Sequence, residues 1–297
     1  MKILIAISSE QYSGPTLSLG MKISSAFKAS TTIVDVGSKI SEFGFKEVSI
    51  ANQVIESWGV SRPGIEVLEW AFRYLLKNNF IEVKDDEGGK LKNKLIEEES
   101  NRIEVYLKGK IGNNLSLILR NGDIIGELRE EVQSGNYDVT IIGGSGKRSM
   151  SHDLIQYIDS SILVVKGFDP TNNYRILLVI DDSPYMKKVL KYGVRVAQAF
   201  NIEVDFLVVS KNKTLSEKNK IVIDYSSKYL RRCNVKFKLL TKIGNPEEKI
   251  IKTAGNNHII IMGVSIKSPI AKFFQSSIPL EVMKSCDCPI LIVKPSN

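Results

Sequence analysis

The sequence has few of the residues that stabilise small secreted proteins or bind metal ions. Its 297 residues include only three cysteines and two histidines, too few for a disulfide framework or a cysteine–histidine metal site. No apolar run reaches the ~18 residues that span a bilayer, and the opening segment 1–8 is too short for a signal peptide. Hydrophobic residues make up 43% and charged residues 25%, a globular balance that excludes wholesale disorder. We expect a cytoplasmic protein without a metal site or a membrane partner.

Charge is distributed unevenly along the chain. Residues 1–170 carry 20 basic and 23 acidic side chains, whereas residues 171–297 carry 21 and 10. A basic half can indicate an anionic partner such as a nucleic acid. The lysines form no block, however, and no recognition helix or stacking platform is visible. A solvated lysine surface is therefore favoured, and nucleic-acid binding is the least favoured function.

Two parts of the chain open and close with similar segments. KILIAISS (2–9) is similar to RILLVIDDS (175–183), and each contains an apolar run typical of a strand buried on both faces of a parallel sheet. DVTIIGGSG (138–146) is likewise similar to HIIIMGVS (258–265). Because this repeat spans about half the chain, it predicts duplicated domains and not a solenoid.

The repeat divides the chain into a domain at 1–168 and a domain at 174–297, joined by a linker of Gly, Pro and Asn composition. Strands and helices alternate in both, which predicts mainly parallel sheets. The second domain is the simpler copy, with a strand predicted at 258–263 and a short helix around 278–285. The first contains additional segments at 37–62 and 81–113, and we expect the latter to form a β-hairpin or a flexible arm.

Three second-half segments are similar in order and spacing to a known family. They are RILLVIDDSPYMKKVLKYG (175–193), KIGNPEEKIIKTA (242–254) and the stretch from HIIIMGVS to CPILIVK (258–294). The sequence resembles the universal stress protein family in its tandem two-domain form. This resemblance implies an α/β fold of two tandem open parallel five-stranded sheets, each with strand order 3-2-1-4-5 and flanked by helices.

The resemblance implies a nucleotide-binding crevice between strands 1 and 4 of the second half. Open α/β sheets bind ligands beyond the carboxyl ends of their strands, where the strand order reverses. Both arguments select the strand ends at Asp181 and Gly263. By resemblance, Asp181 contacts the nucleoside and the backbone of Val209 reads the adenine edge. The complete set of nucleotide-binding candidates is Asp181, Val209, Gly263, Ser276, Ser277 and Ile278.

The phosphate loop of this crevice departs from the family pattern. Gly263 and Ser277 match the first glycine and the hydroxyl residue, but Ile266 and Ser276 occupy the two other glycine positions. A β-branched residue at a turn that needs positive φ costs energy and blocks close approach of a phosphate. Asp181 can also have a structural role in place of nucleotide binding, because it can cap the helix that is predicted to begin near Pro184. ATP or another adenine nucleotide is therefore expected only with a degenerate phosphate loop.

The first half departs further from the pattern, because Ser8 replaces the strand-1 aspartate. Gly143, Gly146, Lys147 and Ser149 are candidates for a weak anion site. The alternative, a tight strand-to-helix turn, is favoured for this segment.

Two functions follow from these patterns. The first is a stress-response sensor or slow switch that binds an adenine nucleotide and is at most a slow ATPase, since no catalytic set is evident. The second is a non-nucleotide scaffold for dimerisation or for an unknown protein partner. Edge strands 161–166 and 289–294 resemble the family's dimerisation strand, and we predict that they pair with each other within one chain. A homodimer remains an open alternative.

Overall fold

The computed structural model describes residues 1–37, 65–82, 94–99, 102–106, 115–144, 154–155, 157–212, 214–264 and 278–295. The strands of its first half are β1 (Lys2–Ile7), β2 (Ser30–Gly37), β3 (Lys94–Glu99), β4 (Arg102–Tyr106), β5 (Leu115–Asn121), β6 (Val139–Gly143) and β7 (Ser161–Val165). The helices are α1 (Glu10–Phe27), α3 (Ile65–Lys77) and α4 (Ile124–Gly135).

The second half repeats this alternation of strands and helices. Its strands are β8 (Arg175–Val179), β9 (Val204–Ser210), β10 (Phe237–Ile243), β11 (His258–Gly263) and β12 (Ile290–Val293). Its helices are α6 (Met186–Phe200), α7 (Glu217–Arg232), α8 (Pro246–Ala254) and α9 (Ile278–Ser285).

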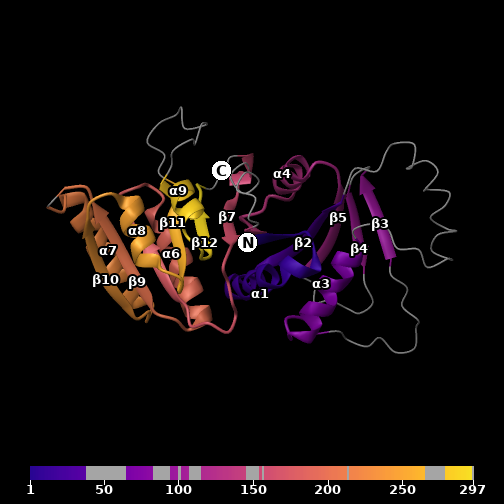
Figure 1. The fold of residues 1–297 in the computed structure, drawn as a ribbon, viewed down its shortest axis with the longest axis horizontal. Coiled ribbons are helices and arrows are strands. Elements are labelled where there is room, and N and C mark those ends of the chain that lie inside the picture. Colours follow the sequence, from indigo (N-terminus) through magenta and orange to yellow (C-terminus); the bar gives the residue numbers. More distant parts are fainter. Residues whose placement is uncertain are drawn as a thin grey trace.

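The described strands form one 12-stranded sheet that crosses the whole molecule (Figure 1). Its order is β10-β9-β8-β11-β12-β7-β6-β1-β2-β5-β4-β3. Each half contains five strands in the expected order 3-2-1-4-5, and β4 and β3 extend the first half by two strands. The prediction of two separate sheets is wrong, because β12 pairs antiparallel with β7 and joins the two units. The register places Ile290 opposite Val164 and Ile292 opposite Ile162, so the two predicted edge strands lie side by side. The strands of the two halves therefore run in opposite directions.

A close helix–strand contact recurs at equivalent positions in the two halves. A Cβ atom on Gly20 of α1 would lie 2.8 Å from Cδ1 of Ile5 in β1. A Cβ atom on Gly193 of α6 would lie 2.6 Å from Cδ1 of Leu178 in β8. Because only glycine allows the helix to pack this closely, the pair of contacts supports duplication of one structural unit.

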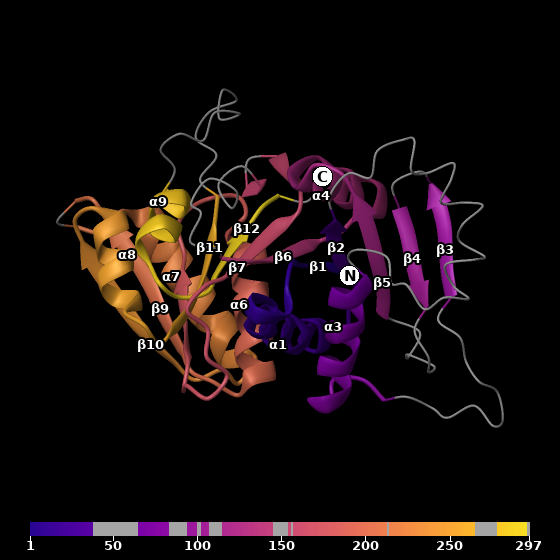
Figure 2. The ribbon, with the colours of Figure 1, turned by 45° about the vertical axis from the view of Figure 1, so that its right-hand side comes forward.

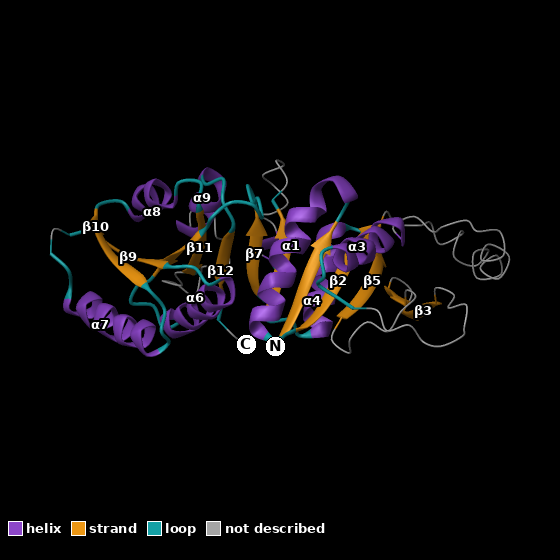
Figure 3. Cartoon of the chain, turned by 90° about the horizontal axis from the view of Figure 1, so that it is seen from below, coloured by secondary structure: helices purple, strands orange, loops and turns teal. Residues whose placement is uncertain are grey.

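Helices cover both faces of the sheet. The apolar side chains of α1, α3, α6 and α7 pack on one face, and those of α4, α8 and α9 pack on the other. Figure 3 shows α6 and α7 on the opposite side of the second-half strands from α8 and α9. No helix in the described part of the chain is sufficiently long and apolar to cross a membrane.

The predicted insertion at 81–113 contributes the antiparallel hairpin β3–β4, which extends the sheet beside β5 (Figure 2). A buried charge network holds it there. Arg120 is 2% exposed, and its Nε and Nη1 atoms donate to Glu127 at 2.7 Å and Glu131 at 2.8 Å. Arg102 of the hairpin donates to the same Glu131 at 3.1 Å. Nearly all of the other predicted insertion, 37–62, lies outside the described residues.

Two lysines at equivalent positions bridge the junction between the halves. Lys166 directly follows β7, and its Nζ atom donates to the carbonyl oxygen of Cys286, just beyond α9, at 2.8 Å. Lys294 directly follows β12, and its Nζ atom donates to the carbonyl oxygens of Ile155 at 2.5 Å and of Ile158. Burial lowers the pKa of Lys294 to about 8. Each half therefore extends a cation to backbone carbonyls of the other.

Candidate functional site

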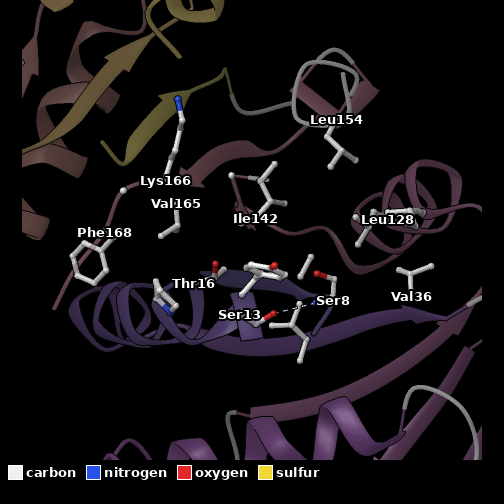
Figure 4. A pocket seen from close by; sticks show the side chains of 18 of the residues that line it. Ser8, Ser13, Thr16, Val36, Leu128, Ile142, Leu154, Val165, Lys166 and Phe168 are labelled. Atoms are coloured by element: carbon white, nitrogen blue, oxygen red, sulfur yellow. Dashed lines mark hydrogen bonds between the residues drawn. The ribbon is translucent and has the colours of Figure 1, made fainter. Parts of the chain in front are cut away.

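A crevice of about 660 Å³ lies at the carboxyl ends of β1, β2 and β6 in the first half (Figure 4). The strand order reverses here, because β1 lies between β6 and β2. This is the place where an open α/β sheet binds its ligand. The volume is within the range of small-molecule sites, roughly 300–1,000 Å³.

The walls of the crevice are largely apolar. The last residues of β1, β2 and β6 form its floor, and α4 together with the chain after β7 form its sides. The apolar lining residues are Ala6, Ile7, Pro15, Val36, Ile124, Leu128, Ile142, Leu154, Val165 and Phe168. Tyr12, which is 70% exposed, and Ile124, which is 41% exposed, also line it. Such walls favour a ligand with a planar or otherwise apolar part.

Small hydroxyl groups from the β1–α1 turn and from the first turns of α1 supply much of the polar lining, and Asp169 after β7 adds a carboxylate. The Ser13 hydroxyl accepts hydrogen bonds from the backbone N–H groups of Ser8 at 3.2 Å and Ser9 at 3.3 Å, which holds the turn at the start of α1 (Figure 4). Thr16 lies across from Gly143, where an added Cβ atom would be 3.2 Å from its hydroxyl oxygen. The absence of a side chain at Gly143 therefore leaves space at the end of β6.

Lys166 carries the only positive charge among the described lining residues. Its side chain extends away from most of the other labelled lining side chains (Figure 4). The ammonium group bonds to Cys286 and lies 3.7 Å from a carboxylate oxygen of Asp287, which is mostly exposed. The neighbouring Gly144 N–H is bonded to Val165 at 2.7 Å. In this conformation the described walls of the crevice are therefore mainly apolar and hydroxyl-bearing, with the Asp169 carboxylate at one side.

The strand registers relate this crevice to the one predicted in the second half. They make Ser8 equivalent to Asp181, Val36 equivalent to Val209, and Gly143 equivalent to Gly263. The site predicted from the sequence is therefore the second-half equivalent of this first-half crevice. The repeat itself was the evidence that could have directed attention to the first half.

Three predicted second-half residues lie at the carboxyl ends of neighbouring strands. Asp181 follows β8, Val209 is the last residue but one of β9, and Gly263 ends β11. Asp181 is exposed, and its Oδ1 atom accepts a hydrogen bond from the Ser183 N–H at 3.1 Å within the turn after β8. The predicted helix cap is wrong, because α6 begins at Met186 and its N-cap, Tyr185, has no side-chain cap hydrogen bond. The Ser183 hydroxyl is buried and has no partner among the described residues. Ile278 is half-buried at the start of α9.

Several other predicted residues lie outside the described residues. They are Ser276 and Ser277 of the second-half loop, together with Gly146, Lys147 and Ser149 of the weak anion site. Of that anion site, only Gly143 is described, and it lines the crevice. The sequence did not identify Thr16, Leu128 or Lys166 as site residues. They reach the crevice only because segments distant in the sequence pack together.

A buried carboxyl group lies close to the crevice. Asp35 is the third residue from the end of β2, is 5% exposed and points to the sheet face opposite to that of its neighbour Val36. Burial raises its pKa to about 6, opposed by a hydrogen bond from the Val36 backbone. In the second half the equivalent residue is Val208, so the position also suits an apolar side chain.

Residues 173–294 match the model of the universal stress protein family. The second half is a universal stress protein domain. The family resemblance that the sequence indicated is therefore confirmed for the second half. The first half repeats the strand order of the second. No curated relative of the sequence was found.

Solved structures resemble the universal stress protein fold of the whole chain. A universal stress protein from Archaeoglobus fulgidus DSM 4304 matches with 12% identity over 99% of this chain and 97% of that chain, with a TM-score of 0.59. A functionally unknown protein from Pseudomonas aeruginosa PAO1 matches with 11% identity over 99% and 92%, also with a TM-score of 0.59. The cytoplasmic domain of a prokaryotic cation chloride cotransporter matches with 10% identity over 99% and 95%, with a TM-score of 0.54. At these identities the likeness establishes the fold alone, so function has to be argued from the site.

Proposed function

We propose that this chain is a stress-response sensor whose first-half crevice binds an adenine nucleotide with few phosphates, such as AMP. The observation that carries the proposal is the 660 Å³ crevice at the point where the strand order reverses. The second-half crevice, at Asp181, Val209 and Gly263, is the alternative location for the same ligand.

The lining of the crevice matches the parts of a nucleoside monophosphate. The apolar walls suit a purine ring, which gains from contact with flat or aliphatic surfaces. The hydroxyl groups of Ser8 and Thr16 suit the ribose, and the bare backbone at Gly143 allows a phosphate to approach. A single lysine in the described lining suits one phosphate better than three. Fast hydrolysis would need groups that activate water or hold a metal ion. The described lining has one carboxylate, Asp169, whose Oδ1 atom already accepts two hydrogen bonds from Thr171, so we propose binding and not fast hydrolysis.

Thermal unfolding with millimolar AMP, ATP and adenosine tests the proposal. A ligand that binds only the folded state at ~100 times its Kd stabilises that state by ~2.7 kcal/mol, which raises the melting temperature. We expect AMP to raise it at least as much as ATP. No shift with any of these compounds would contradict nucleotide binding.

A matched pair of variants identifies the crevice that is occupied. Gly143 and Gly263 are equivalent and neither has positive φ, so both accept a larger side chain without backbone strain. A Cβ atom would meet Thr16 at 3.2 Å in the first case and Val189 at 3.1 Å in the second. We expect Gly143→Leu to abolish the AMP response and Gly263→Leu to retain it. The opposite result would place the ligand in the second half.

A separate observation supports an interaction scaffold as the second candidate function. Ile221 and Tyr225 of α7 and Leu239 and Ile243 of β10 are between 40% and 67% exposed. Because β10 is an edge strand of the sheet, these side chains lie beside an open strand edge, which is a typical partner surface. If this surface mediates self-association, Leu239→Ser should reduce it in sedimentation velocity experiments at several protein concentrations.

A further inference from the structure

Lys166 lies between the first-half crevice and the end of α9 in the second half. It lines the first-half crevice, and its ammonium group binds the Cys286 carbonyl oxygen at the end of α9 in the second half. The last carbonyl groups of a helix lack partners within the helix, and a cation at that end is favourable. At its other end α9 begins at Ile278, a candidate residue of the second-half crevice. The helix therefore extends from the lysine to a residue of the predicted second-half site.

The two bridging lysines differ in their freedom to change partners. Lys294 is 8% exposed and binds two carbonyl oxygens, so the surrounding structure fixes it. The Lys166 side chain is 32% exposed, binds one carbonyl oxygen and lies 3.7 Å from a carboxylate oxygen of the mostly exposed Asp287. Four rotatable bonds allow a partly exposed lysine to reach more than one acceptor. Lys166 is therefore the mobile member of the pair.

We propose that an anionic group in the first-half crevice draws the Lys166 ammonium away from Cys286 and thereby loosens the end of α9. This coupling rests on the proposed function. Through it, binding in the first-half crevice would change the structure of the second half. A phosphate is a stronger acceptor for an ammonium group than a neutral carbonyl oxygen. Adenosine fills the same crevice without the charge, so it leaves Lys166 on α9.

The cysteines of the chain report on this change. Cys286 and Cys288 lie between α9 and β12 and are 4% and 1% exposed, so their thiols react slowly while the end of α9 is held. Cys233 follows α7 elsewhere in the second half and is half-buried. It therefore serves as a reference thiol in the same molecule.

The experiment follows modification of each cysteine by N-ethylmaleimide with mass spectrometry, in the full chain, with AMP, with adenosine and without ligand. We expect AMP to accelerate labelling of Cys286 and Cys288 roughly tenfold, the factor for loss of about one hydrogen bond from a charged donor. Adenosine should leave these rates unchanged, and Cys233 should react equally in all samples. Acceleration by adenosine equal to that by AMP would overturn the proposal, because charge would then not be the trigger.

Variants at two lysines test whether Lys166 is the link. In Lys166→Met, labelling of Cys286 and Cys288 should be fast with or without AMP. Lys166→Arg keeps the positive charge and should retain the AMP response, which would show that the position tolerates substitution. Lys284→Met removes a cation from α9 that pairs with Glu281 and faces no crevice residue in the described contacts, so it should behave like the unmodified chain. If Lys166→Met labels as the unmodified chain does, the proposal is wrong.

Failure of the coupling is distinguishable from failure of the proposed function. If AMP raises the melting temperature and leaves the labelling rates unchanged, nucleotide binding stands and the coupling is wrong. If AMP produces no change in melting temperature or in labelling, the proposed function is wrong and the coupling falls with it.

Discussion

Replacing Asp35 with asparagine should stabilise the folded protein at neutral pH. The carboxyl group is 5% exposed, and burial raises its pKa from the ordinary value of 3.8 to about 6 in the folded state. Between these two values the folded state binds more protons than the unfolded state. The free energy of unfolding therefore decreases as the pH rises through this range, and the carboxylate destabilises the folded state above pH 6.

The size of the effect follows from the difference between the two pKa values. One pKa unit corresponds to about 1.36 kcal/mol, so ionised Asp35 costs about 3 kcal/mol at pH 7.5. The asparagine side chain is neutral and of nearly the same shape, and we expect Asp35→Asn to recover most of that amount. At pH 4 the gain should fall below about 1 kcal/mol, because the folded chain already holds the proton.

Urea unfolding followed by circular dichroism at pH 7.5 and pH 4 measures the difference. Asp182→Asn is the control, because Asp182 is an exposed carboxylate and its replacement should change the free energy of unfolding by less than ~0.5 kcal/mol. A variant no more stable than the parent at pH 7.5 would refute the reasoning, as would a gain of equal size at both pH values.

Two further predictions concern the packing that supports the site. Arg120→Met should destabilise the protein by about 3–5 kcal/mol in urea unfolding, because it removes the buried cation that pairs with the Glu127 and Glu131 carboxylates, whereas Arg102→Met should cost less because Arg102 is 20% exposed. An equal loss in both variants would contradict this explanation. Gly167 and Gly255 have φ of 57° and 51°, so alanine is strained at either position. Gly167→Ala should cost at least ~2 kcal/mol more than Gly255→Ala, because only at Gly167 does the new Cβ atom overlap a backbone oxygen, that of Asp287. Equal melting temperatures for the two variants would show that this contact is unimportant.

Elements with strong local patterns could be predicted from the sequence. The strand predicted at 258–263 and the helix predicted around 278–285 agree with β11 and α9, because one is an apolar run buried on both faces and the other has a short amphipathic pattern. The start of α1 at Glu10 is harder to predict from the sequence. Pro15 lies inside this helix, and proline ordinarily indicates a helix start.

The site was predicted less completely than the fold, for physical reasons. The rule for open α/β sheets located the end of strands 1 and 4, and the structure has a crevice there in the first half. Lys166 could not be assigned from sequence, because its partner at Cys286 is brought near it only by the pairing of β7 with β12. The buried position of Asp35 depends likewise on packing across the sheet, and Val208 at the equivalent position shows that local sequence does not require a carboxylate there.

The antiparallel pairing of β7 with β12 also determines the directions in which the carboxyl ends of the strands point in the two halves. Since their strands run in opposite senses, the carboxyl end of β1 beside Ser8 and that of β8 beside Asp181 belong to opposite edges of the sheet. A large partner seated on one edge leaves the other accessible to solvent. One polypeptide thus presents two equivalent strand ends of different chemistry, a hydroxyl at Ser8 and a carboxylate at Asp181, which two identical subunits joined along the same strand could not do.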